Sequence, residues 1–161
     1  NREVLNMTKK TIERTKTKPV FGAHKRKAFL AKQNSSKPSS KKKILAVDDE
    51  QDILTSLKML LEGEGYQVKT VDNGKEALQL VQKEKFDLVL LDILMPEMAG
   101  TEVAEKIRDN PKTKDQKIAF LTVVTLGEQG KKTIQKIKPV AYLQKPFQVI
   151  EFRKHIKKIL G

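Results

Sequence analysis

The stretch that decides the fold is residues 86–100, FDLVLLDILMPEMAG. Its apolar run, residues 88–91, is short and continuous, which is typical of a strand buried on both faces of a parallel sheet. The run ends on a carboxylate, Asp92, and open α/β sheets place their chemistry at the carboxyl ends of their strands. Because an unpaired carboxylate beside a core is costly, we expect Asp92 to bind a ligand or to react.

Apolar runs alternate with amphipathic segments over the rest of the sequence from residue 44. The predicted strands are residues 44–47, 66–71, 88–91, 118–122 and 140–143. The predicted helices are residues 50–62, 73–85, 101–109, a segment after the fourth strand, and 148–160. In the last helix the positions expected to face the core are Val149, Phe152, Ile156 and Ile159. This alternation predicts an α/β fold, a doubly wound sheet of five parallel strands flanked by five helices.

The helix after the fourth strand is poorly specified. Gly127 and Gly130 each lower helix propensity by about 1 kcal/mol relative to alanine. We therefore expect this helix to be short or mobile.

The first 43 residues differ in charge from the rest of the sequence. They contain 14 Lys and Arg residues against two acids, a net charge of +12, whereas residues 44–161 contain 19 against 18. Residues 1–43 are therefore expected to form a basic, disordered tail and linker, and residues 44–161 suffice for one domain. The tail could bind nucleic acid, an anionic membrane or an acidic partner, or it could only link and solubilise.

Polar side chains follow four of the five predicted strands. They are Asp48 and Asp49 after the first strand, Asp92 after the third, Thr122 after the fourth and Lys145 after the fifth. Because parallel strands with right-handed crossovers end at one edge of a sheet, these groups should meet there. Three carboxylates repel each other unless a cation is present, and so few protein oxygens favour Mg²⁺ over Ca²⁺. With a lysine and a hydroxyl, such a site suits phosphoryl transfer.

At these positions the sequence resembles the receiver domains of two-component response regulators, typified by the single-domain chemotaxis regulator. The resemblance covers about residues 42–161 and is carried by Val47-Asp48-Asp49-Glu50, Asp72-Asn73-Gly74-Lys75-Glu76-Ala77, Asp92-Ile93-Leu94-Met95-Pro96 with Gly100, Thr122, and Tyr142 ahead of Lys145-Pro146-Phe147. It implies a flavodoxin-like sheet with strand order 2-1-3-4-5. It also implies a phosphorelay signalling protein that assists its own phosphorylation and dephosphorylation but is not an enzyme.

The resemblance also implies a role for each matching residue. Asp92 would accept a phosphoryl group from a sensor histidine kinase, and Lys145 and Thr122 would contact the phosphoryl oxygens. The ligands of Mg²⁺ would be Asp48, Asp49, Asp92 and the backbone carbonyl of Leu94. The Lys145-Pro146 peptide would be cis, which is otherwise rare.

The implied output depends on a conformational switch. Tyr142 would turn inward when Thr122 moves toward the phosphoryl group, and an unknown downstream protein would bind the fourth helix, fifth strand and fifth helix. Val123 departs from the family pattern, which has a small residue there, and would narrow the access to Asp92. Thr125 offers an alternative switch hydroxyl, although the spacing favours Thr122.

Three functions remain open at the level of sequence. The first is a receiver that binds a partner in one phosphorylation state. The second is a nucleic-acid-associated regulator whose basic tail is the effector, and the third is a small phosphatase with an aspartyl nucleophile. Leu94 argues against the phosphatase, because such enzymes commonly have a second acid at that position. The lack of cysteine and of a long apolar run leads us to expect a soluble cytoplasmic protein.

Overall fold

The computed structural model describes residues 41–123 and 128–161. Along this part of the chain the elements are β1 (Lys43–Val47), α3 (Gln51–Gly63), β2 (Gln67–Val71), α4 (Gly74–Lys83), β3 (Leu88–Asp92), α5 (Gly100–Asp109), β4 (Ile118–Thr122), α6 (Glu128–Ile137), β5 (Ala141–Gln144) and α7 (Val149–Leu160). The predictions made for residues 1–40 and for Thr125 lie outside the described residues.

The five strands form one parallel sheet in the order β2-β1-β3-β4-β5, which confirms the predicted fold. The strand ends are aligned by the register, which pairs Val47 with Leu91 and Thr122 with Gln144. The groups that follow the strands therefore come together at the carboxyl edge of the sheet.

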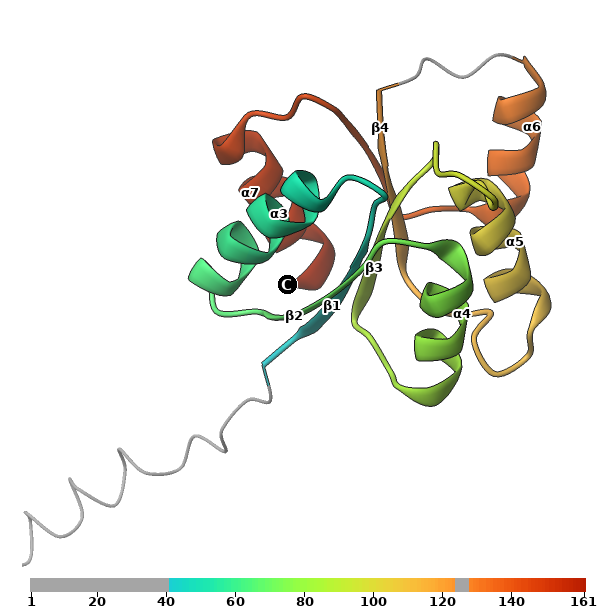
Figure 1. Cartoon of the computed structure of the whole chain (residues 1–161), viewed down its shortest axis with the longest axis horizontal. Helices are drawn as coiled ribbons and strands as arrows, with labels where there is room; N and C mark the ends of the chain where they lie inside the picture. Colours follow the sequence, from blue (N-terminus) through green and yellow to red (C-terminus); the bar gives the residue numbers. More distant parts are fainter. Residues whose placement is uncertain (1–40, 124–127) are drawn as a thin grey trace, which may run out of the picture. The chain divides into compact units, whose positions relative to one another are not determined.

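Helices cover both faces of the sheet (Figure 1). On one face lie α4, α5 and α6, and on the other lie α3 and α7. Side chains alternate along each strand, so that Leu91 packs toward the first group of helices and Leu90 toward the second. Because both faces are covered, β3 and β4 are buried at every position, as the continuous apolar runs predicted.

Two expectations about the helices are corrected. The α6 helix has ten residues, as many as α4 and α5, so it is not short, whereas its mobility stays a prediction. In α7, Phe152 and Ile156 are buried as predicted, but Val149 is 47% exposed and Leu160 is the buried residue at the end of the helix. Val149 is the first residue of α7, at the carboxyl edge of the sheet. The spacing of apolar residues predicts which side of a helix faces the core, but it does not predict where along the helix the packed surface ends. No helix in the described ranges is long and apolar enough to cross a membrane.

Candidate functional site

Three carboxylates meet at the carboxyl edge of the sheet. Asp48 and Asp49 follow β1 and Asp92 ends β3, and one oxygen of each lies within 4.8 Å of the others. Asp48 and Asp92 are buried, whereas Asp49 is exposed. The sequence prediction that these three acids come together is thus met by the geometry.

Lys145 neutralises part of this charge. Its ammonium lies 2.5 Å from Oδ2 of Asp48 and 3.1 Å from Oδ2 of Asp92. Burial by itself lowers the pKa of Lys145, but its hydrogen bonds to the two carboxylates outweigh burial and raise that pKa. The lysine therefore keeps its charge and holds the ends of β1 and β3 together.

The sequence did not predict the contact between Lys145 and Asp48. Asp48 is fully buried, and its Oδ1 accepts the backbone N–H of Glu50 at 3.1 Å. The acid therefore also orders the turn into α3. A buried acid at a strand end next to a second acid is the signal that could have predicted this role.

Asp92 has one oxygen that is not satisfied. Its Oδ1 is buried and accepts no hydrogen bond from the residues that the structure describes. Burial raises the pKa of Asp92, the hydrogen bonds from Lys145 and from the backbone N–H of Leu94 oppose this rise, and the charge of Asp48 adds to it. A buried acceptor without a partner is costly, which indicates that this oxygen is kept for a ligand.

The loop after Asp92 is fixed by close backbone contacts. The N–H of Gly100 donates to the carbonyl of Ile93 at 2.9 Å, and the N–H of Ile93 donates to the carbonyl of Leu121 at 3.2 Å. A Cβ on Gly100 would lie 1.8 Å from the carbonyl oxygen of Asp92. Only glycine therefore lets α5 begin so close to the end of β3.

The two predicted switch residues lie on neighbouring strands. Thr122 is buried at the end of β4, and its carbonyl accepts the N–H of Lys145 at 2.7 Å. Tyr142 is 41% exposed on β5 and stacks on Phe120, with ring centroids 5.7 Å apart. Partial burial raises the pKa of Tyr142 to about 12, so its hydroxyl is protonated at neutral pH. The Lys145-Pro146 peptide is cis, as expected.

The acidic cluster fits a Mg²⁺ site. Its donors are carboxylate oxygens, which Mg²⁺ prefers, and three of them leave room for water and for a phosphoryl group. The unsatisfied oxygen of Asp92 supplies the same kind of donor. Val123 follows Thr122 in the chain and Leu94 lies two residues after Asp92, and their side chains are 59% and 54% exposed.

The comparison with known families identifies the class of protein. Residues 44–157 match the response regulator receiver domain, so the chain belongs to this family. PhoP of Bacillus subtilis, described as an alkaline phosphatase synthesis transcriptional regulatory protein, is 38% identical over 122 residues, which cover 74% of this chain and 48% of that protein. Histidine kinase P4 of Formosa agariphila is 36% identical over 125 residues, 74% of this chain and 9% of that protein. The chain thus spans about half the length of the first relative.

Solved receiver structures have the same fold. The chemotaxis protein CheY4 of Vibrio cholerae superposes with a TM-score of 0.69 and 32% identity over 75% of this chain and 100% of that chain. TrrA of Thermotoga maritima, in complex with Mg²⁺-BeF, gives a TM-score of 0.64 and 40% identity over 74% of this chain and 99% of that chain. Both confirm the CheY-like, flavodoxin-like architecture.

Proposed function

We propose that this receiver domain accepts a phosphoryl group on Asp92 from a phosphohistidine of a sensor histidine kinase. The observation that carries the proposal is the buried, unsatisfied Oδ1 of Asp92, whose other oxygen, Oδ2, is paired with the ammonium of Lys145. An Asp92 oxygen forms a bond to phosphorus while the P–N bond of the phosphohistidine breaks, and the histidine nitrogen keeps the electron pair. The similarity to a segment of a histidine kinase supports this class of donor.

Each neighbour of Asp92 has a role in this transfer. Lys145 is placed to pass from Asp92 to a phosphoryl oxygen, and Thr122 supplies a hydroxyl to a second oxygen. The residues that would hold Mg²⁺ are Asp48, Asp49, Asp92 and the backbone carbonyl of Leu94. The ion would neutralise charge on the transferring oxygens, and the Mg²⁺-BeF complex of the Thermotoga protein supports this assignment.

The output of the proposed receiver is a change at the strand next to the site. Movement of Thr122 toward the phosphoryl group would open space for Tyr142 to turn inward from its half-exposed position on Phe120. The face formed by α6, β5 and α7 would then present a different surface to a downstream protein. In this proposal residues 44–161 are the receiver and residues 1–43 are a separate basic tail.

The test is intact-protein mass spectrometry after incubation with acetyl phosphate, with and without Mg²⁺. We expect one added phosphoryl group on the wild type only when Mg²⁺ is present, and none on Asp92→Asn. The matched control is Asp72→Asn, which removes an exposed acid from the same edge and should leave the adduct intact. An adduct of equal yield on Asp92→Asn would overturn the assignment.

A further inference from the structure

The two outermost strands of the sheet differ in how their free sides are protected. The strands β2 and β5 lie at opposite ends of the strand order, and each pairs with one neighbour. An outermost strand presents backbone N–H and C=O groups along its free side, and proteins usually protect such groups with charged side chains or proline. On β2, Gln67 and Lys69 are exposed, and Lys69 is paired with Glu84. The free side of β2 is thus protected by polar and charged side chains.

The strand β5 lacks this protection. Its four residues, Ala141–Gln144, include no charged side chain and no proline. The N–H of Val140, just before the strand, donates to the carbonyl of Ile118 on β4 at 2.8 Å. Because successive N–H groups of a strand point to opposite sides, the N–H of Ala141 points away from β4. No strand of the described ranges pairs with β5 on that side, so its outward backbone groups are available to an added strand.

An apolar groove lies beside the free side of β5. The groove has a volume of about 200 Å³ and is formed by β5, the turn after it and the first two turns of α7. The rings of Phe147 and Phe152 stack in its wall, with centroids 4.4 Å apart. Tyr142, Leu143 and Pro146 add to the apolar lining. In recognition by strand addition, pockets for alternate side chains give specificity, and this groove can receive an apolar side chain of an added strand.

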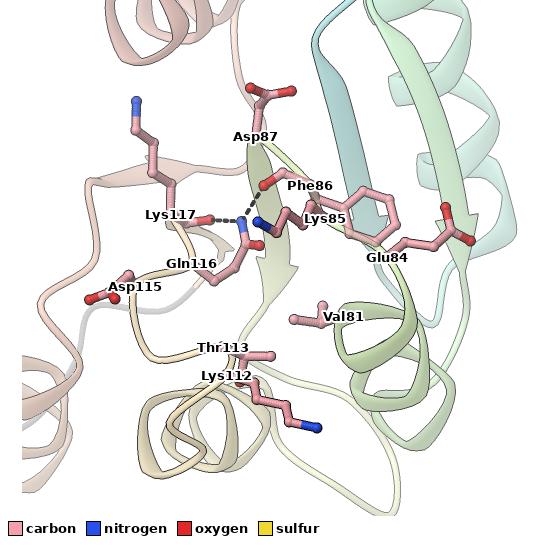
Figure 2. Close-up of a pocket in the computed structure, with 10 residues that line it drawn as sticks. All are labelled: Val81, Glu84, Lys85, Phe86, Asp87, Lys112, Thr113, Asp115, Gln116 and Lys117. Carbon is pink, nitrogen blue, oxygen red and sulfur yellow. Dashed lines mark hydrogen bonds between the residues drawn. The ribbon is translucent and has the colours of Figure 1, made fainter.

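A larger hollow at the amino ends of the strands has a different character (Figure 2). It has a volume of about 420 Å³ and lies between the end of α4 and the connection from α5 to β4. Its lining contains three lysines and three acids. The amide of Gln116 donates to the carbonyls of Phe86 and Lys117 at 3.0 and 3.1 Å. The charges of this hollow balance, so it favours no class of ligand.

The surroundings of the β5 groove are basic. Residues 132–161, which include the second half of α6, β5 and α7, contain eight basic residues and one acid, Glu151. Glu151 lines the groove but is paired with Lys154 at 2.8 Å. Lys158 lies seven residues after Glu151, on the same side of α7, and Lys138 lies at the entry to β5. Both lysines are exposed and form no ion pair with any residue that the structure describes, so their charge is free to attract acidic side chains.

We propose that β5 binds an extended acidic segment of a partner protein, which adds a strand to the sheet and places an apolar side chain in the groove. This inference rests on the proposed output surface and names the chemistry of its partner, although pairing with an outermost strand needs no phosphoryl group. A second copy of this chain would bring a second basic surface against the first, and like charges oppose association. An anionic membrane supplies negative charge but no backbone groups to pair with the strand.

The test measures binding of a fluorescently labelled peptide to the full chain by fluorescence anisotropy, without Mg²⁺ or a phosphodonor. In this peptide, valine alternates with glutamate around a central phenylalanine. A matched peptide has the same sequence with N-methyl groups along its central part, which removes the backbone donors and blocks strand pairing. Because the two peptides carry the same charge, their attraction to the basic N-terminal segment is the same.

Variants of the protein test the same strand. Ala141→Pro removes the outward N–H of β5, whereas the matched control Ala141→Val keeps it. Lys138→Glu with Lys158→Glu reverses two charges near the groove, and its control, Lys58→Glu with Lys112→Glu, reverses two exposed lysines on α3 and on the connection after α5. Circular dichroism verifies that each variant is folded. If Ala141→Pro does not fold, the N-methylated peptide still tests the strand pairing.

We expect N-methylation of the peptide, Ala141→Pro, and Lys138→Glu with Lys158→Glu each to weaken binding about tenfold. Both control variants should bind the unmodified peptide as the wild type does. Equal binding of the two peptides by the wild type would overturn the proposal, and so would no binding of the unmodified peptide, including the case in which the protein binds only anionic vesicles. A wild-type dimer that Ala141→Pro dissociates, measured by size-exclusion chromatography, would assign the strand to a second copy and also overturn it. Because the protein is unphosphorylated throughout, failure of the mass-spectrometric test of Asp92 would leave these results unchanged.

Discussion

Two aspartates, one at each end of β3, have opposite environments. At its amino end, Asp87 has both carboxylate oxygens occupied by hydrogen bonds from Lys43 and Lys42. Burial opposes ionisation of Asp87, but these bonds outweigh it and lower its pKa. At the carboxyl end, Asp92 is buried with an unsatisfied oxygen and a raised pKa. The carboxylate at the amino end is thus fully hydrogen-bonded, whereas the carboxylate at the carboxyl end keeps a buried oxygen without a partner among the described residues.

The largest effect is expected where the carboxyl edge is packed most tightly. Gly100→Ala would place a Cβ 1.8 Å from the carbonyl oxygen and 2.8 Å from the carbonyl carbon of Asp92. Backbone atoms must move to relieve this overlap, so the free energy of unfolding should fall by about 3 kcal/mol. The measurement is urea denaturation followed by circular dichroism.

Gly63→Ala is the control for this prediction. Gly63 ends α3, and a Cβ there would meet nothing within 4 Å. Alanine should be neutral or stabilise the helix by about 0.5–1 kcal/mol. Similar stabilities of the two variants would contradict the close approach at Gly100.

The next prediction concerns the amino end of β3. Asp87→Ala removes the acceptor of the Lys43 N–H, so the free energy of unfolding should fall by about 2 kcal/mol at neutral pH. Because the folded pKa of Asp87 is lowered, its stabilisation is present above the unfolded pKa of about 3.9 and is lost as the pH falls through the folded value. Asp115→Ala, an exposed acid of the same edge, should change stability by less than about 0.5 kcal/mol. If the difference in the free energy of unfolding between wild type and Asp87→Ala stayed constant down to acidic pH, stabilisation by the ionised Asp87 carboxylate would be excluded.

The sequence predicted the carboxyl edge far better than the amino edge. Strand polarity alone brings Asp48, Asp92 and Lys145 together, because each lies at the carboxyl end of a parallel strand. The ion pair of Asp48 with Lys145 depends on the direction of the two side chains, which cannot be predicted from the spacing of the residues in the sequence. The hydrogen bonds from Lys42 and Lys43 to Asp87 join residues more than 40 positions apart. Asp87 is not part of a sequence motif that would have predicted them.

The excess of basic residues at the amino edge was missed for a related reason. Its lysines lie in three connections and in residues 41–43, and residues 44–161 have nearly equal numbers of basic and acidic residues. Composition therefore averages the two edges to zero. Only the topology, which sends every helix C-terminus to one edge, separates the charges.

The smallest change in the free energy of unfolding is expected for Asp92→Asn, and the sign of this change is the most informative result. The substitution keeps the shape of the side chain, removes a buried charge next to Asp48, and leaves Lys145 paired with Asp48. In buffer without Mg²⁺ we expect the free energy of unfolding to rise by about 1 kcal/mol at neutral pH, measured by urea denaturation. Asp72→Asn, at an exposed acid of the same edge, should stay within about 0.5 kcal/mol of the wild type.

The pH dependence of this gain follows from the raised pKa of Asp92. A raised folded pKa favours folding below the unfolded pKa of about 3.9, and this advantage is lost as the pH rises through the folded value. The variant should therefore gain most at neutral pH and nothing in acid. Mg²⁺ should stabilise the folded wild type more than the variant by mass action. It should therefore narrow the difference in the free energy of unfolding between the two proteins. Destabilisation by Asp92→Asn at neutral pH without Mg²⁺ would show that Asp92, like Asp87, is held in place for stability.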